Sequence, residues 1–220
     1  MRVKIIPTVF ALNKKEFDTK FKKLYNITKE LQIDFMDGKF VKNKSVDIKY
    51  VPNLKSYNKK YGLKCEAHLM IKNPIKLISK LNQIGFKKIL IHFSAFKTEV
   101  ELINCLNEIK KYKMIPALVI NPNIKLNLIE KLIPKFKTIM LMGVYPGAEG
   151  QSFVSTNYLK IKKLRQKFPK LNIQIDGGVN LKTIKKIVDS GANILNSGSF
   201  ISSSDNPKNS LNILKKLANS

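Results

Sequence analysis

The chain has 220 residues, 44% of them hydrophobic, which suits one large domain with a substantial core. Its formal net charge is +26, yet arginine occurs only at Arg2 and Arg165, and the lysines are spread over almost every segment. Because arginine is the usual residue for bidentate phosphate and base recognition, we interpret the charge as a lysine-rich surface and do not expect nucleic-acid binding.

The sequence also limits the compartment in which the protein works. It has no apolar run of about eighteen residues, and its N-terminal segment lacks the apolar stretch and small-residue cleavage site of a signal peptide. Its two cysteines, Cys65 and Cys105, are far apart, which is typical of free thiols in a reduced protein. We therefore expect a cytoplasmic protein without a membrane span.

Short β-like runs alternate with longer amphipathic runs along the chain. The predicted strands are Val3–Ile6, Leu31–Phe35, Lys64–Leu69, Lys88–His92, Ile115–Val119, Thr138–Met142, Asn172–Ile175 and Ala192–Leu195. The predicted helices are Lys14–Lys29, Asn73–Ile84, Glu99–Lys111, Leu126–Leu132, Asn157–Lys167, Leu181–Ser190 and Pro207–Ala218. This alternation predicts an α/β fold, a small closed (β/α)₈ TIM barrel that forms a single domain over residues 1–220. An open doubly wound sheet is the alternative.

Polar residues at the strand ends favour the barrel. They follow or end nearly every predicted strand from the second to the eighth, whereas an open sheet uses only the loops at its switch point. These positions are Asp34, Asp37, His68, His92, Asn121, the Gly143–Gly150 loop, Asp176 and Gly198-Ser199.

Asp34 lies on the same face of its strand as Gln32 and Met36, and in a barrel this face points inward. An interior carboxylate is costly unless it pairs, binds a metal or takes part in chemistry, so we assign Asp34 a functional role. We interpret His68, near the end of the next strand, as a metal ligand or a polarising group. For Asp37, next to a glycine, we expect a loop-ordering role.

Three glycine-rich segments follow the sixth, seventh and eighth strands. They are Gly147-Ala148-Glu149-Gly150, Asp176-Gly177-Gly178 and Gly198-Ser199. Glycine lets backbone N–H groups approach an anion closely, and phosphate sites in barrels commonly use the last two of these loops. One such cluster is typical of a tight turn, but three after consecutive strands predict a phosphate site.

Two carboxylates on opposite sides of the predicted barrel mouth suggest a definite chemistry. Asp34 and Asp176 can face opposite sides of one carbon next to a carbonyl group. One removes a proton and the other returns a proton from the far face, which inverts the stereocentre. The enediolate intermediate requires a metal ion or fixed donors to stabilise its charge.

With these residues in place, the chain resembles the ribulose-phosphate 3-epimerase family from Pro7 to Ser199. The resemblance rests on Asp34-Phe35-Met36-Asp37-Gly38-Lys39-Phe40-Val41, His68-Leu69-Met70, Asn121-Pro122, Pro146-Gly147, Gly150-Gln151-Ser152-Phe153, Asp176-Gly177-Gly178-Val179 and Gly198-Ser199. It implies a (β/α)₈ enzyme that interconverts D-ribulose 5-phosphate and D-xylulose 5-phosphate. It also implies a homo-oligomer.

The resemblance further implies residue roles. Asp34 and Asp176 would be the acid/base pair, and these two with His68 would hold a divalent cation (zinc, iron, manganese or cobalt), with the fourth ligand at Gln32. Methionines expected to line the site are Met36, Met70 and Met142. Residues expected to contact the sugar phosphate are Thr8, His68, Gly147, Ala148, Glu149, Gly150, Gly177, Gly178, Gly198 and Ser199.

The chain departs from the family pattern at the site. Gln32 replaces a histidine, and an amide oxygen is a poorer zinc ligand than imidazole, so we expect a weaker metal site, a preference for harder ions or a metal-free variant. Thr8 replaces a serine, and Tyr145 replaces an asparagine. Glu149 places a negative charge near the predicted phosphate site, which is unfavourable unless the side chain points away.

Three activities follow from these departures. They are a pentose-phosphate epimerase, an epimerase for a related ketose phosphate such as a hexulose 6-phosphate, and a sugar-phosphate-binding protein with little catalysis. We favour the first, because both proton-transfer carboxylates are present.

Overall fold

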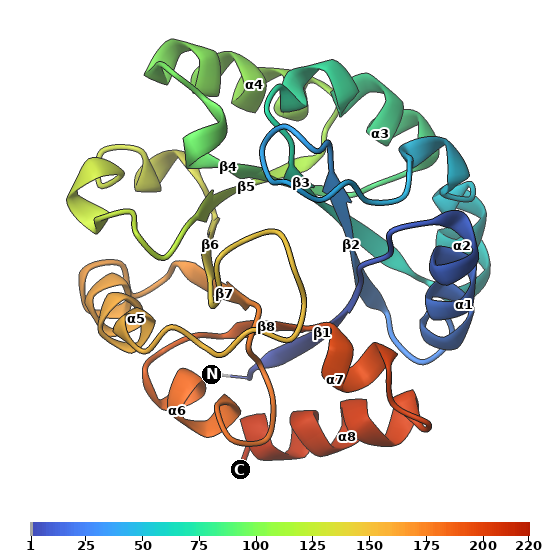
Figure 1. Ribbon diagram of the computed structural model, residues 1–220. Helices are drawn as coiled ribbons and strands as arrows, with labels where there is room; N and C mark the ends of the chain where they lie inside the picture. Colours follow the sequence, from blue (N-terminus) through green and yellow to red (C-terminus); the bar gives the residue numbers. More distant parts are fainter. Residues whose placement is uncertain (1) are drawn as a thin grey trace.

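The computed structural model describes residues 2–220 of the protein. Eight parallel strands pair in chain order, and the last pairs with the first, so the sheet closes into a barrel ringed by helices (Figure 1). The strands are β1 Lys4–Val9, β2 Glu30–Met36, β3 Lys64–Met70, β4 Lys88–His92, β5 Ile115–Ile120, β6 Thr138–Met142, β7 Asn172–Asp176 and β8 Ile194–Ser197. The predicted (β/α)₈ barrel is confirmed, and the open sheet is excluded.

Helices begin and end where the sequence supplies capping residues. They are α1 Lys14–Leu24, α2 Leu54–Tyr61, α3 Ile78–Ile84, α4 Glu99–Lys111, α5 Thr156–Lys167, α6 Ile184–Asp189, α7 Ser199–Ser202 and α8 Pro207–Ala218. The side chains of Asn13 and Thr98 accept hydrogen bonds from main-chain N–H groups in the first turns of α1 and α4. Helices α2 and α3 both end at a glycine in the left-handed conformation, Gly62 and Gly85.

Two predicted helices differ from the structure, and one helix was not predicted. The expected helix Leu126–Leu132 is wrong: this connection holds only the short 3₁₀ turns Leu126–Leu128 and Ile133–Lys135. Pro134 disfavours the α conformation at the residue before it, which leaves too short a segment for a helix. Helix α1 stops five residues before the predicted end at Lys29, because the chain must turn there into β2. Helix α2 was not predicted.

The barrel interior has an apolar side and a polar side. The outward-facing strand residues form the main core with the helices, whereas the inward-facing ones fill the barrel. The apolar side consists of Leu90, Ala117, Val119, Met140 and Met142. The polar side includes Gln32, Glu66, Lys88, Gln174 and Asn196. Among residues 2–220, no helix has both the length and the apolar character needed to cross a bilayer.

The loop between β6 and α5 arches over the barrel mouth (Figure 1). Within this loop, the Gln151 side chain donates hydrogen bonds to the carbonyls of Tyr145 and Ala148. The Asn43 side chain, from the connection after β2, donates to the carbonyl of Gly147 at 2.7 Å. These bonds hold the loop as a cover on the carboxyl-terminal end of the barrel, where the polar strand ends lie.

Candidate active site

A cavity of about 360 Å³ opens at the carboxyl-terminal end of the barrel, beneath the loop that follows β6. Its volume lies within the range of about 300–1,000 Å³ that is usual for small-molecule sites. Of the predicted site residues, the cavity is lined by Thr8, Asp34, Met36, His68, Met70, Met142, Gly147, Ala148, Glu149, Gly150, Asp176, Gly177, Gly178, Gly198 and Ser199. Gln32 is fully buried and does not line it.

Asp34 and Asp176 converge on one nitrogen of His68. The register between β2 and β3 places Asp34 beside His68, and Asp176 comes from β7 across the barrel. The Nδ1 atom of His68 lies 3.1 Å from Asp34 Oδ1 and 3.2 Å from Asp176 Oδ2. Residues more than a hundred positions apart in the sequence therefore share one corner of the cavity.

A second histidine fixes the orientation of the first. The Nε2 atoms of His68 and His92 lie 2.8 Å apart, and His92 Nδ1 lies 2.9 Å from the side-chain oxygen of Asn121. Because that oxygen accepts a proton from His92 Nδ1, His92 Nε2 is left to accept one from His68 Nε2. His68 Nδ1 then faces the two carboxylates as the group available for chemistry.

Burial and mutual contact shift the pKa values of these groups. Burial raises the pKa of Asp34 to about 6, and the nearby Asp176 adds to this while the hydrogen bond from His68 opposes it. Burial alone would lower the pKa of His68, but its hydrogen bonds to Asp176 and Asp34 outweigh burial and raise the pKa to about 10. Burial and the neighbouring His68 hold the pKa of His92 well below its usual value.

Gln32 lies against both carboxylates from the side opposite the cavity. Its Nε2 atom donates to Asp34 Oδ1 at 2.9 Å and to Asp176 Oδ2 at 2.6 Å, with Thr8 Oγ1 at 3.5 Å. Its side-chain oxygen accepts from Asn196 Nδ2 at 2.9 Å. The amide nitrogen, not the oxygen, thus faces the acidic pair.

Three side chains can hold a divalent cation. One ligand atom each from Asp34, His68 and Asp176 lies within 4.8 Å of the others, and all three residues are buried. Carboxylate oxygens and a neutral imidazole suit zinc, iron or manganese, and His68 donates its other ring proton to a neighbour, as metal-binding histidines do. At the fourth position, Gln32 presents an amide nitrogen, which has no lone pair for a metal.

The comparisons with known proteins agree with this geometry. A model described as the Ribulose-phosphate 3 epimerase family matches residues 4–202. The chain belongs to this family. It is accordingly an isomerase of the epimerase type that acts on carbohydrates, as the site residues predicted.

Proteins named ribulose-phosphate 3-epimerase are similar over most of the chain. The protein of Schizosaccharomyces pombe is 29% identical and covers 81% of this chain and 77% of its own. That of Methanocaldococcus jannaschii is 30% identical over 84% of this chain and 78% of its own. Solved structures such as a complex of KGPDC from Streptococcus mutans (TM-score 0.76, 12% identity, 99% of this chain and 98% of that chain covered) are similar in fold.

In this epimerase-family chain, two of the glycine loops pack directly against each other. A Cβ atom on Gly143 would lie 2.1 Å from the carbonyl oxygen of Gly177, and one on Gly177 would lie 2.5 Å from the Val144 side chain. Gly177 and Gly178 also have positive φ angles, 92° and 70°. These glycines therefore seat the loop after β6 on the loop after β7, besides lining the cavity.

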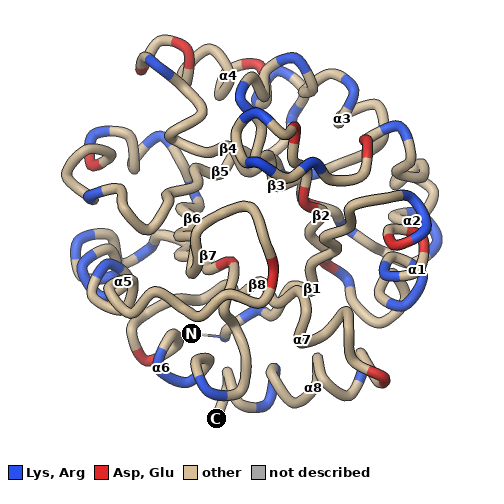
Figure 2. Tube along the Cα trace, viewed as in Figure 1, with Lys and Arg blue, Asp and Glu red and all other residues tan. Residues whose placement is uncertain are grey.

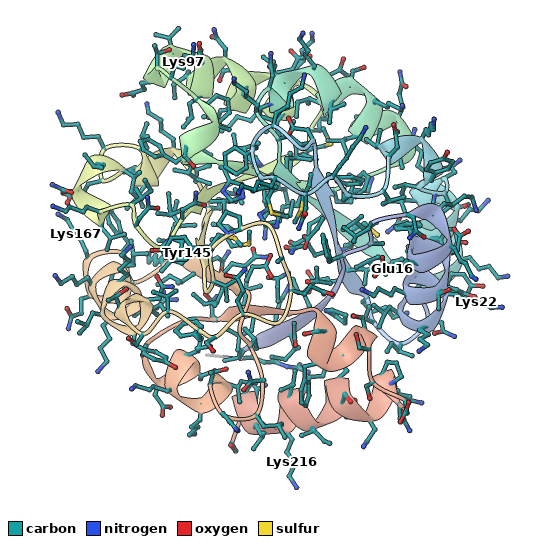
Figure 3. The ribbon with its side chains drawn as sticks, viewed as in Figure 1. Glu16, Lys22, Lys97, Tyr145, Lys167 and Lys216 are labelled. Atoms are coloured by element: carbon teal, nitrogen blue, oxygen red, sulfur yellow. The ribbon has the colours of Figure 1, made fainter. Side chains whose placement is uncertain are left out.

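The epimerase-family site contains an acidic side chain that does not point away from the predicted phosphate region. Glu149 Oε1 lies 2.8 Å from the position that a Cβ atom on Gly198 would take. Its other oxygen pairs with Lys20 of α1 at 3.3 Å, and Lys20 also pairs with Glu16 at 2.8 Å. Figure 3 shows Glu16 on the side of α1 nearer the barrel mouth. Burial raises the pKa of Glu149, while Lys20 opposes that rise.

Proposed function

We propose that the protein interconverts D-ribulose 5-phosphate and D-xylulose 5-phosphate by inverting carbon 3, with Asp34 and Asp176 as the proton-transfer pair. The observation that carries the proposal is that the two carboxylates, from β2 and β7, line one cavity and reach the same His68 nitrogen. Relatives that cover most of the chain carry the name of this activity. The sugar phosphate is proposed as the substrate on the same grounds.

In the proposed reaction, one aspartate removes the proton from carbon 3 and the other protonates the opposite face. The first must be ionised and the second protonated, so the two groups exchange states with each turnover. The raised pKa of Asp34, about 6, lets this carboxyl both accept and release a proton near neutral pH. Asp34 and Asp176 are 8% and 7% exposed, so bulk water has little access to the transferred proton.

The charge of the enediolate requires stabilisation. A divalent cation on Asp34, His68 and Asp176 would polarise the substrate carbonyl and lower the pKa of the neighbouring carbon. His68 orients both carboxylates through Nδ1 and is itself held by His92. The side chains of Met36, Met70 and Met142 add an apolar wall, in which electrostatic interactions are stronger than in water.

The phosphate group is proposed to bind where the loops after β6, β7 and β8 meet. The residues that line the cavity include neither lysine nor arginine. The phosphate would therefore be held by backbone N–H groups at Gly177, Gly178, Gly198 and Ser199 and by the Ser199 hydroxyl. Phosphate sites of (β/α)₈ enzymes frequently use the last two of these loops.

Exchange of the carbon 3 proton in deuterated water tests the proton-transfer pair. We expect Asp34→Asn and Asp176→Asn each to slow exchange at least about 100-fold, the lower end for loss of a general acid or base. Asp18→Asn, an exposed aspartate paired with Lys14 on α1, is the matched control and should leave exchange unchanged. Retained exchange in both active-site variants would remove the proposed pair.

The same preparation separates the other two activities. Faster turnover of a hexulose 6-phosphate than of ribulose 5-phosphate would assign a different ketose phosphate to the site. Thermal stabilisation by ribulose 5-phosphate without any proton exchange would indicate a binding protein.

A further inference from the structure

A continuous network of polar side chains crosses the barrel below the two aspartates. Lys88 Nζ donates to Gln174 Oε1 at 2.5 Å, and Gln174 Nε2 donates to Asn196 Oδ1 at 2.6 Å. Asn196 Nδ2 then donates to Gln32 Oε1 at 2.9 Å, and Gln32 Nε2 donates to the two aspartates. Gln32, Gln174 and Asn196 are fully buried, so these bonds are not exchanged with solvent.

The direction of every bond in this network is set by two groups that cannot reverse. Lys88 can only donate, and Glu66, which pairs with Lys88 at 3.1 Å, only accepts while it is ionised. Glu66 Oε1 accepts from Gln174 Nε2 at 2.6 Å and from Asn196 Nδ2 at 3.0 Å. The Gln174 and Asn196 amides each satisfy these fixed partners in one orientation only.

The orientation of Gln32 follows from this. If its amide were reversed, Gln32 Nε2 would face Asn196 Nδ2, and two donors would be left without acceptors in the barrel interior. Its oxygen would at the same time face two carboxylates. Each buried unpaired polar group costs about 1–3 kcal/mol, so the orientation seen here is strongly favoured.

We propose that Gln32 is a positioning residue that donates hydrogen bonds to Asp34 and Asp176, and not a metal ligand, because Lys88 and Glu66 fix its amide through Gln174 and Asn196. A cation at the site would then have three ligands from this chain. It would also share the carboxylate oxygens with the Gln32 N–H groups. The inference concerns the site of the proposed function, but its test uses no sugar phosphate, so the two can fail separately.

Zinc affinity, measured by competition with a chromophoric chelator, tests whether Gln32 is a ligand. Gln32→Leu removes the amide at similar volume, and we expect it to bind zinc at least one third as tightly as the parent protein. Met140→Leu, a volume-conserving change on the apolar side of the barrel, is the control for altered packing. A loss greater than threefold in Gln32→Leu, with Met140→Leu unchanged, would overturn the proposal.

Nuclear magnetic resonance of the Gln32 side-chain amide tests the fixed orientation, with or without measurable zinc binding. In protein labelled with [¹⁵N]glutamine, the signal is identified by its loss in Gln32→Leu. The double variant Glu66→Gln with Lys88→Met removes both fixed groups without leaving one buried charge unpaired. We expect it to accelerate exchange of the Gln32 amide protons at least tenfold, whereas Lys87→Met, at an exposed neighbour, should not. Equal exchange rates in the double variant and the parent protein would overturn the proposed fixing of the amide.

Discussion

The carboxyl of Asp34 has a pKa of about 6 because it is buried, with Asp176 nearby. As the proposed base it must be ionised, so kcat/KM for ribulose 5-phosphate should fall as the pH drops through about 6. The expected slope below that pH is tenfold per unit for one group. A bound cation would favour the ionised form and move the fall to lower pH. Rate profiles with and without added zinc measure both effects, and a flat profile from pH 7 to 4 would contradict the assignment.

The Glu149 carboxylate lies against Gly198, where we propose that the substrate phosphate binds. A phosphate dianion is repelled by this charge, so Glu149→Gln should lower KM several-fold and leave kcat nearly unchanged. The substitution also frees Lys20 from one of its two acidic partners, which adds positive potential beside the cavity. Steady-state kinetics in dilute buffer measures the change.

The matched control for this prediction is Glu130→Gln. Glu130 is paired with Lys167, and Figure 3 shows Lys167 at the outer edge of the helical ring. Loss of that charge should leave KM unchanged. If KM rises in Glu149→Gln, the carboxylate orders the loop, and its effect on the loop outweighs its repulsion of the substrate.

Among the elements, the strands were more predictable than the connections. A buried parallel strand appears in the sequence as a short apolar run, and all eight predicted runs overlap strands of the barrel. The connection between β5 and β6 was wrong because its apolar spacing suits a helix, whereas Pro134 limits it to 3₁₀ turns. Helix α2 had readable signals at both ends, Asn53 before it and Gly62 after it, that the apolar periodicity did not reveal.

The candidate site was predictable only in part. Asp34, His68 and Asp176 were found because each lies near the carboxyl end of a strand. The supporting residues Glu66 and Gln174 lie two positions earlier on the same inward faces, so the alternation of the strands could have indicated them. Which polar groups pair across the barrel depends on the closure of the sheet, and neighbouring residues in the sequence do not contain that information.

The packing of the loops after β6 and β7 gives a prediction at the scale of the element. Gly143→Ala would place a Cβ atom 2.1 Å from the Gly177 carbonyl oxygen, so the backbone must move. We expect the free energy of unfolding to fall by about 1–3 kcal/mol, as for other overpacked sites, and KM to rise. Thermal unfolding and steady-state kinetics measure the two effects.

Gly150→Ala is the comparison for this change. Gly150 has a φ of 80°, and no atom lies within 4 Å of the position that a Cβ atom would take there, so only the backbone conformation resists the substitution. The expected cost is about 1 kcal/mol, without a clash. If both variants unfold at the same temperature, the contact between the two loops does not contribute to stability.

At the scale of the whole molecule, the net charge of +26 surrounds a cavity lined without basic side chains. Figure 2 shows most of the lysines on the outer ring of helices, with few at the centre of the barrel mouth. Such an arrangement provides no concentrated basic stripe for a nucleic acid, but it produces a positive field that attracts a small dianion from every direction. The charge therefore favours substrate capture over a second binding activity.

This field predicts a dependence on salt. Raising the ionic strength from about 0.01 M to 0.15 M shortens the screening length from about 30 Å to about 8 Å, which removes most of the long-range attraction. We expect kcat/KM for ribulose 5-phosphate to fall several-fold over this range while kcat stays constant. Binding of the uncharged sugar ribulose should not change, because it lacks the dianion on which the field acts. A constant kcat/KM for the phosphate ester would mean that the lysines act only on solubility, and retention on duplex DNA at 0.15 M salt would show that the field has a macromolecular partner.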